Sequence, residues 1–261
     1  MFRAQMKTLP LILALLPVCG AATSAQIPKL PAGNSQRQVL FDFRVHRNTP
    51  PLQIPPATER SVLAKLFRRY LNDPDKCNQN FEGNGNDPLQ AARDAGQIVP
   101  DISDMATGSF TAAGQKQTLY VIAVNECNAS HAENYGTKRV AIFSGQQLIA
   151  NVDVDFKNTI VKKTDLNGDG IDELLMTADD MHQGVVDEVA GLLEFPNGKL
   201  RVIQDLGSVL EDACPSGMQG SSTTAAVISI GGATAGKMPK LLVDNYEARC
   251  TKTRRWRLVK K

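Results

Sequence analysis

Oxygen-bearing side chains alternate along the stretch DLNGDGIDE, residues 165–173. With the first aspartate as position one, they fall at positions one, three, five and nine, on Asp165, Asn167, Asp169 and Glu173. Calcium is a hard cation that takes roughly six to eight oxygen ligands at about 2.3–2.6 Å. Short Asp and Asn side chains at alternate positions allow a tight loop to surround such an ion. The spacing therefore predicts a loop that binds a calcium ion.

Two further residues of the loop fit the same interpretation. Gly170 at position six permits a backbone turn that a Cβ atom would block. Ile171 at position seven offers its carbonyl oxygen while its side chain enters the core. The four carboxylates of the stretch repel one another unless a cation lies among them, so a solvated turn without metal is the weaker alternative. An EF-hand is disfavoured because position twelve, where that motif needs glutamate, is Met176, and because both flanks have β-type sequences.

Residues 165–174, DLNGDGIDEL, resemble the calcium loop of FG-GAP repeats of the integrin-like and VCBS type. In that family a D-x-N-G-D-G-x-D-[DE]-L loop joins the two outer strands of a propeller blade. The resemblance extends over one blade, about residues 159–206, although the FG and GAP signature of the family is absent. It implies that Asp172 points outward. The ligands that it implies are the side chains of Asp165, Asn167, Asp169 and Glu173 and the carbonyl of Ile171.

The strands that must hold this loop are expected after residue 105. Short segments rich in Ile, Val, Leu, Phe and Tyr follow one another there, several with apolar residues at every second position, and helical patterns are absent. Residues 144–147 and 196–199 have the composition of tight hairpin turns. We therefore expect a mainly β fold, with an all-β repeat domain over residues 105–261.

A weak internal repeat runs through this domain. Residues 108–121 align with residues 164–177, and residues 226–246 form a third copy. The alignment predicts antiparallel four-stranded, blade-like units of roughly 55 residues, arranged as a propeller-like assembly or as a β-meander. The corresponding loops of the first and third copies contain no carboxylate. We therefore expect one calcium ion and not several.

The first part of the chain is expected to be a leader and a linker. Residues 1–25 have a basic start, an apolar run of about ten residues and small residues before Gln26, which together predict a secretory signal peptide. Residues 26–56 are rich in proline and predict a linker that contains one candidate strand, at 38–45.

A single helix is expected between the linker and the β domain. An apolar stripe at helical spacing predicts a helix over residues 58–71, capped by Thr58. Residues 72–104 are polar and rich in Asn, Gly and Asp, which favours a loop. The segment 57–104 is therefore expected to be one helix followed by a loop that a disulfide tethers.

Four cysteines follow the expected signal peptide, namely Cys77, Cys127, Cys214 and Cys250. An even number in an exported chain indicates disulfides, and three pairings are open. Proximity in the sequence favours Cys77–Cys127 and Cys214–Cys250. A zinc site is disfavoured because no CxxC pair exists, and lipid attachment at Cys19 is disfavoured because Val18 is too large and Pro17 too stiff for that motif. The expected location is the periplasm or the extracellular medium.

The sequence does not identify a substrate. Without the first 25 residues the chain has 27 basic and 27 acidic residues, which argues against nucleic-acid binding, and no later apolar run approaches the length of a transmembrane helix. Common catalytic motifs are absent. We expect a module that binds a protein, a glycan or a component of the cell envelope. The alternatives are a hydrolase that uses loop residues near His131 or His182, and a structural subunit of an envelope assembly.

Overall fold

The structure is a computed structural model of the chain, and it describes eight segments. These comprise residues 37–45, 52–72, 77, 95–127, 137–155, 157–231, 236–251 and 253–259. The expected signal peptide, Cys19 and His131 lie outside the described residues. All described segments belong to one structural unit, Gln36–Lys261.

Strands form more than half of the described chain. The first sheet consists of β2 (Ile98–Gly108), β3 (Gln117–Glu126), β4 (Thr137–Ser144) and β5 (Gln147–Asp153). The second sheet consists of β1 (Arg37–Asp42), β6 (Thr159–Thr164), β7 (Glu173–His182), β8 (Val185–Glu194), β9 (Arg201–Asp212), β10 (Ser222–Gly231), β11 (Lys240–Arg249) and β12 (Arg257–Leu258). The α-helix is α1 (Pro56–Leu66), and two short 3-10 helices are η2 (Pro196–Gly198) and η3 (Cys214–Ser216).

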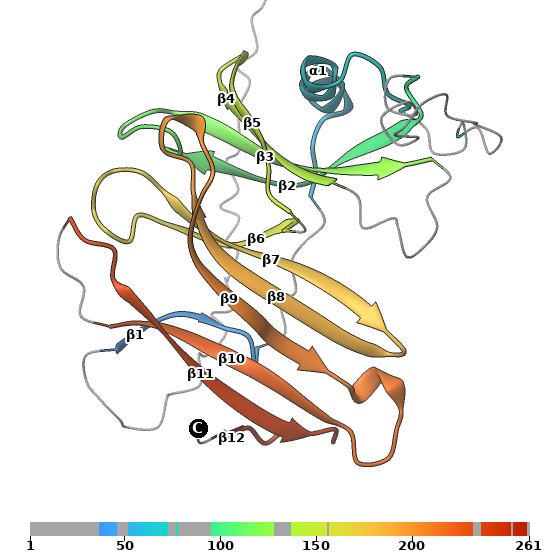
Figure 1. The fold of residues 1–261 in the computed structure, drawn as a ribbon, viewed down its shortest axis with the longest axis vertical. Helices are drawn as coiled ribbons and strands as arrows, with labels where there is room; N and C mark the ends of the chain where they lie inside the picture. Colours follow the sequence, from blue (N-terminus) through green and yellow to red (C-terminus); the bar gives the residue numbers. More distant parts are fainter. Residues whose placement is uncertain are drawn as a thin grey trace, which may run out of the picture. The chain divides into compact units, whose positions relative to one another are not determined.

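The first sheet is an antiparallel meander in the order β2-β3-β4-β5, and α1 lies beside it (Figure 1). Val62 and Leu63 of the helix are buried in one core cluster with Ile122 of β3 and Phe143 of β4. The apolar stripe of the helix therefore covers one face of this sheet, as an amphipathic helix is expected to do.

Two boundaries in this part differ from the sequence expectation. The helix starts at Pro56 without a side-chain cap, and proline suits the first turn of a helix. It ends at Leu66 because Phe67 has an extended backbone. Strand β2 occupies residues 98–108, partly within the segment expected to be a loop. Its proline at 100 conceals the strand pattern, yet it is tolerated because β2 is an edge strand of its sheet.

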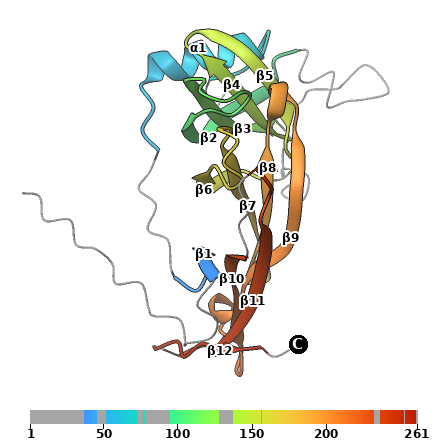
Figure 2. The same cartoon turned by 90° about the vertical axis from the view of Figure 1, so that its left-hand side faces the viewer.

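The second sheet is a longer meander, in the order β12-β11-β10-β9-β8-β7-β6. It curls because β9 pairs with β10 only at residues 223–225 of β10. Beside residues 227–231 of β10, β1 replaces β9 as the neighbouring strand. Register shifts between β8 and β9 add to the bending. The view of Figure 2 shows β1 next to β10, where it extends the curled sheet. The candidate strand at 38–45 thus belongs to the β domain and not to a linker.

The two sheets share a core. Leu119 and Val140 of the first sheet lie in one buried cluster with Leu174 and Leu193 of the second. The mainly β, antiparallel fold with one helix is therefore confirmed. The sequence left open a propeller-like assembly or a β-meander, and the observed strand order is that of meanders. Strands β2–β5 form a four-stranded, blade-like unit, whereas the strands of the second and third repeat copies are joined in one continuous sheet.

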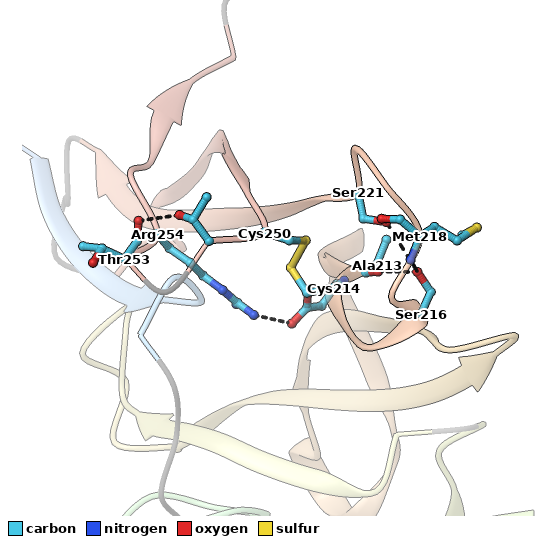
Figure 3. Close-up of a disulfide and its surroundings, with 10 residues drawn as sticks. Ala213, Cys214, Ser216, Met218, Ser221, Cys250, Thr253 and Arg254 are labelled. Atoms are coloured by element: carbon cyan, nitrogen blue, oxygen red, sulfur yellow. Dashed lines mark hydrogen bonds and ion pairs between the residues drawn. A yellow bond between two sulfur atoms is a disulfide. The ribbon is translucent and has the colours of Figure 1, made fainter.

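The structure contains two disulfides, Cys77–Cys127 and Cys214–Cys250. The second links the connection between β9 and β10 to the residue that follows β11 (Figure 3). Such bonds persist in oxidising compartments and are rare in the cytosol. Among the described residues, no helix is long and apolar enough to cross a membrane.

Candidate metal centre

The acidic loop is the connection of the β6–β7 hairpin. Thr164 lies opposite Glu173 in the strand register, so residues 165–172 leave the sheet as one loop. Gly168 and Gly170 have positive φ angles of 75° and 84°. Glycine adopts this conformation without the steric cost that a side chain would bring. The turn therefore forms where the sequence places its glycines.

Hydrogen bonds within the loop fix the predicted ligands. The Asp165 carboxylate accepts bonds from the N–H groups of Gly168 and Gly170, at 2.7 and 2.9 Å. Asn167 Oδ1 accepts a bond from the Asp169 N–H at 2.8 Å, and its amide nitrogen donates to Asp169 Oδ2 at 2.9 Å. The short polar side chains thus turn back onto their own backbone, as Asp and Asn side chains do in tight turns.

Three of the predicted ligands converge on one point. Carboxylate oxygens of Asp165, Asp169 and Glu173 all lie within 4.8 Å of one another. The Asn167 side chain is hydrogen-bonded to Asp169, and the Ile171 N–H donates a hydrogen bond to Asp169 Oδ1 at 2.8 Å. Asn167 and Ile171, the other two predicted ligand residues, therefore adjoin the cluster. Two like charges at this separation repel by about 3 kcal/mol at an effective dielectric constant of about 20. A bound divalent cation would convert that repulsion into attraction.

Glu173 is the buried member of the cluster, with none of its surface exposed. Its Oε2 accepts a bond from the Leu166 N–H at 2.6 Å, whereas its Oε1 has no hydrogen-bond partner among the described residues. Burial raises the pKa of Glu173 from 4.5 to about 7, against the lowering effect of the bond from Leu166, and the charges of Asp169, Asp165 and Glu194 raise it further. A buried oxygen without a partner costs free energy. A cation beside it would supply the missing interaction.

Glu194 and Arg201 adjoin this centre, and the sequence analysis did not identify them. They lie opposite each other on β8 and β9, and the β7–β8 register brings Glu173 alongside Glu194. Glu194 is buried and forms an ion pair with Arg201. The pKa of Arg201 is raised, first by its bond to Glu194, with smaller contributions from Asp169 and Glu173. The hairpin turn expected at residues 196–199 already places these two side chains opposite each other, so that turn was the sequence signal for this pair.

A second loop supports the acidic loop from outside. The Asp172 N–H donates to the Ser109 carbonyl at 2.7 Å, and Asp172 Oδ2 accepts a bond from the Ser109 N–H at 2.8 Å. Lys163 Nζ lies 3.3 Å from the same carboxylate oxygen. Asp172 was expected to point outward. It does lie outside the cluster, but its side chain is only 17 % exposed, because the β2–β3 loop packs against it.

The donor set of the cluster fits calcium in kind. The atoms brought together are carboxylate oxygens, which hard cations prefer. Zinc prefers sulfur and imidazole nitrogen, and neither belongs to this group of described residues. A second group that could hold a metal, Asp212 with Cys214 and Cys250, is different. Its two sulfur atoms are bonded to each other and cannot act as thiolate ligands.

Of the two candidate hydrolase histidines, the described part of the chain contains only His182. His182 lies at the end of β7 with its side chain 75 % exposed, and it forms an ion pair with Asp180. His131 lies outside the described residues. An exposed pair at a hairpin end has no walls to orient a substrate. A hydrolytic site near either histidine therefore remains a prediction from the sequence.

Comparison of the chain with protein-family models, with curated proteins and with solved structures found no match. The likeness of residues 165–174 to the FG-GAP calcium loop therefore remains a prediction. The interpretation of the centre depends on its own geometry, above all on the buried oxygen of Glu173 that faces two aspartates.

Proposed function

We propose that this protein is an exported, calcium-binding β protein that acts by binding another molecule, and that one structural calcium ion occupies the loop from Asp165 to Glu173. The supporting observation is the fully buried Glu173, which lies beside two further carboxylates and whose Oε1 has no hydrogen-bond partner within the described part of the chain. The ligands of the ion would be Asp165, Asn167, Asp169, the Ile171 carbonyl and Glu173. This is the set that the FG-GAP resemblance of the same residues implies.

The contacts of the loop support a structural role for the ion. The Asn167 carbonyl accepts a hydrogen bond from the Gly236 N–H at 2.8 Å, and Asp172 is hydrogen-bonded to Ser109. The loop therefore touches both the β2–β3 connection and the stretch before β11. An ion that stiffens the loop would stabilise the contacts of these three segments together.

Export and a binding role have separate support. Two disulfides favour an oxidising compartment, and residues 1–25 have the pattern of a signal peptide. The periplasm and the extracellular medium both satisfy these observations. The balanced charge of the remaining chain favours a protein, glycan or envelope component as partner over a nucleic acid.

Calorimetric titration of the purified protein with Ca²⁺ tests the proposal, with thermal unfolding measured in parallel. We expect saturable heat and a higher melting temperature, because a ligand that binds only the folded state stabilises it. Glu173→Gln keeps the side-chain size but removes the charge, and should abolish both effects. Glu211→Gln, at an exposed position on β9, is the control and should behave like the wild type. Absence of heat and of stabilisation in the wild type refutes the metal site.

A further inference from the structure

A cavity of about 640 Å³ lies against the curled sheet, away from the acidic loop. Its floor is formed by side chains of four neighbouring strands, and residues 43–45 after β1 and Arg254 form its walls. The floor residues are Thr159 of β6, Thr177 and Asp179 of β7, Val186 and Glu188 of β8, and Leu210 and Asp212 of β9. The volume is within the range of small-molecule sites, roughly 300–1,000 Å³.

The two arginines of the cavity are held in fixed orientations. Arg44 forms two bonds to the Asp42 carboxylate, at 2.7 and 2.9 Å, and stacks on the Tyr246 ring at 4.2 Å. The pKa of Arg44 is raised, chiefly by its bond to Asp42. Arg254 donates to Asp212 Oδ2 at 2.8 Å. Because a guanidinium carries five N–H donors, each arginine keeps donors for a ligand after pairing.

The acidic groups of the cavity also have neighbours within the chain. Asp179 and Glu188 lie opposite each other on β7 and β8. Asp179 interacts electrostatically with Lys138, whose pKa is lowered chiefly by burial. Glu188 is buried and has an interaction of its own within the chain. Charges of both signs are therefore present on the cavity wall, and the two arginines already have carboxylate partners.

We propose that this cavity binds a short neutral carbohydrate. Sugar hydroxyls both donate and accept hydrogen bonds, so they can bond to paired guanidinium and carboxylate groups at the same time. Val186 and Leu210, which are half-buried, supply apolar surface for the C–H faces of a sugar ring. A ligand with net charge would instead have to compete with the ion pairs already formed. The inference rests on the binding role proposed above and adds a ligand class to it.

The disulfide Cys214–Cys250 holds one wall of the cavity in place. Asp212 accepts bonds from the Cys214 N–H, at 3.0 Å, and from Arg254, and Arg254 follows Cys250 closely in the chain. Figure 3 shows Arg254 extended beside the disulfide, directed toward Cys214. The Arg254–Asp212 pair is thereby fixed before a ligand arrives, which reduces the entropic cost of binding.

Calorimetry with maltotriose, cellotriose, mannotriose and N-acetylated chitotriose tests the inference, with trigalacturonate and de-acetylated chitotriose as charged counterparts. We expect saturable binding of at least one neutral trisaccharide. Arg254→Met should weaken it about tenfold or more, because hydrogen bonds to a charged group are lost. Arg37→Met is the matched control, since Arg37 forms an ion pair with Asp244 outside the cavity and has nearly the same exposure, 38 % against 39 %.

A second variant covers the case in which Arg254→Met disturbs the fold. Val186→Phe fills the floor of the cavity from a half-buried strand position and should block the saccharide while melting temperature is maintained. The inference is overturned if no neutral trisaccharide binds at millimolar concentration, if only a charged one binds, or if both variants bind like the wild type. Calcium stabilisation without saccharide binding refutes this inference alone, whereas saccharide binding without calcium stabilisation refutes only the metal site.

Discussion

The raised pKa of Glu173 predicts that the metal-free protein loses stability as pH rises toward neutrality. Burial favours the neutral acid, so the folded protein keeps a proton that the unfolded chain releases between pH 4.5 and about 7. The contribution of this group to stability is complete below pH 4.5 and is lost as pH rises through about 7. A shift from 4.5 to about 7 corresponds to roughly 3 kcal/mol of folding free energy.

Calcium should reverse this trend, because the ion binds the carboxylate and not the acid. Below pH 7 the ion has to displace the proton of Glu173, so its affinity should fall by about tenfold per pH unit between pH 7 and 5. At neutral pH the same charge that destabilises the metal-free loop becomes a ligand. The proton and the ion therefore compete for one buried oxygen.

Urea unfolding in metal-free buffers between pH 4.5 and 8 measures the first effect, with Glu173→Gln as the reference. Glutamine resembles the protonated acid and does not titrate, so subtracting its free energy of unfolding at each pH isolates the contribution of Glu173. We expect the difference between the two proteins to change by roughly 3 kcal/mol across the window. A difference that stays constant with pH means that Glu173 titrates as it does in water, and the reasoning about its burial fails.

Two further predictions concern the framework of the protein. Gly170→Ala should destabilise it by about 2 kcal/mol or more in urea unfolding, because φ is 84° and the new Cβ would lie 2.8 Å from that of Ala113. The control Gly114→Ala, at φ 70° with open space around it, should destabilise the protein clearly less. Equal losses of stability in the two variants would contradict the packing argument. Replacing Cys214 and Cys250 by serine opens a loop of 36 residues and should remove about 3–4 kcal/mol by chemical unfolding. Unchanged stability would show that the bond restricts the unfolded chain very little.

Local features of the site could be predicted from the sequence, whereas its long-range partners could not. Alternate oxygens around Gly170 lie within nine consecutive residues, so a one-dimensional pattern contains their arrangement. Glu194 and Arg201 reach the same centre only through the pairing of β7, β8 and β9. Their position depends on strand register, which hydrophobic alternation constrains only to within one face of a sheet.

For the fold, too, local features could be predicted from the sequence and long-range pairings could not. Strand content and the hairpin turns follow from local composition, but the number of separate sheets depends on which edges pair. Residues 223–225 of β10 pair with β9, and residues 227–231 pair with β1, about 190 residues earlier in the chain. A repeat of similar hairpins does not specify such a contact. Strand β2 was missed because Pro100 is a turn signal in most contexts and an edge-strand residue here.

The candidate metal centre and the carbohydrate cavity share strand β7 but not the same part of it. Glu173 begins the strand and Thr177, the nearest cavity residue on it, lies four residues further along, a separation of about 13 Å at the usual rise per residue. An ion at Glu173 therefore cannot contact a ligand in the cavity. Its effect on binding has to act through the rigidity of the sheet, because β7, β8 and β9 carry both sites. Calcium removal should consequently lower the stability of the protein far more than its affinity for a saccharide, whereas Arg254→Met should do the opposite.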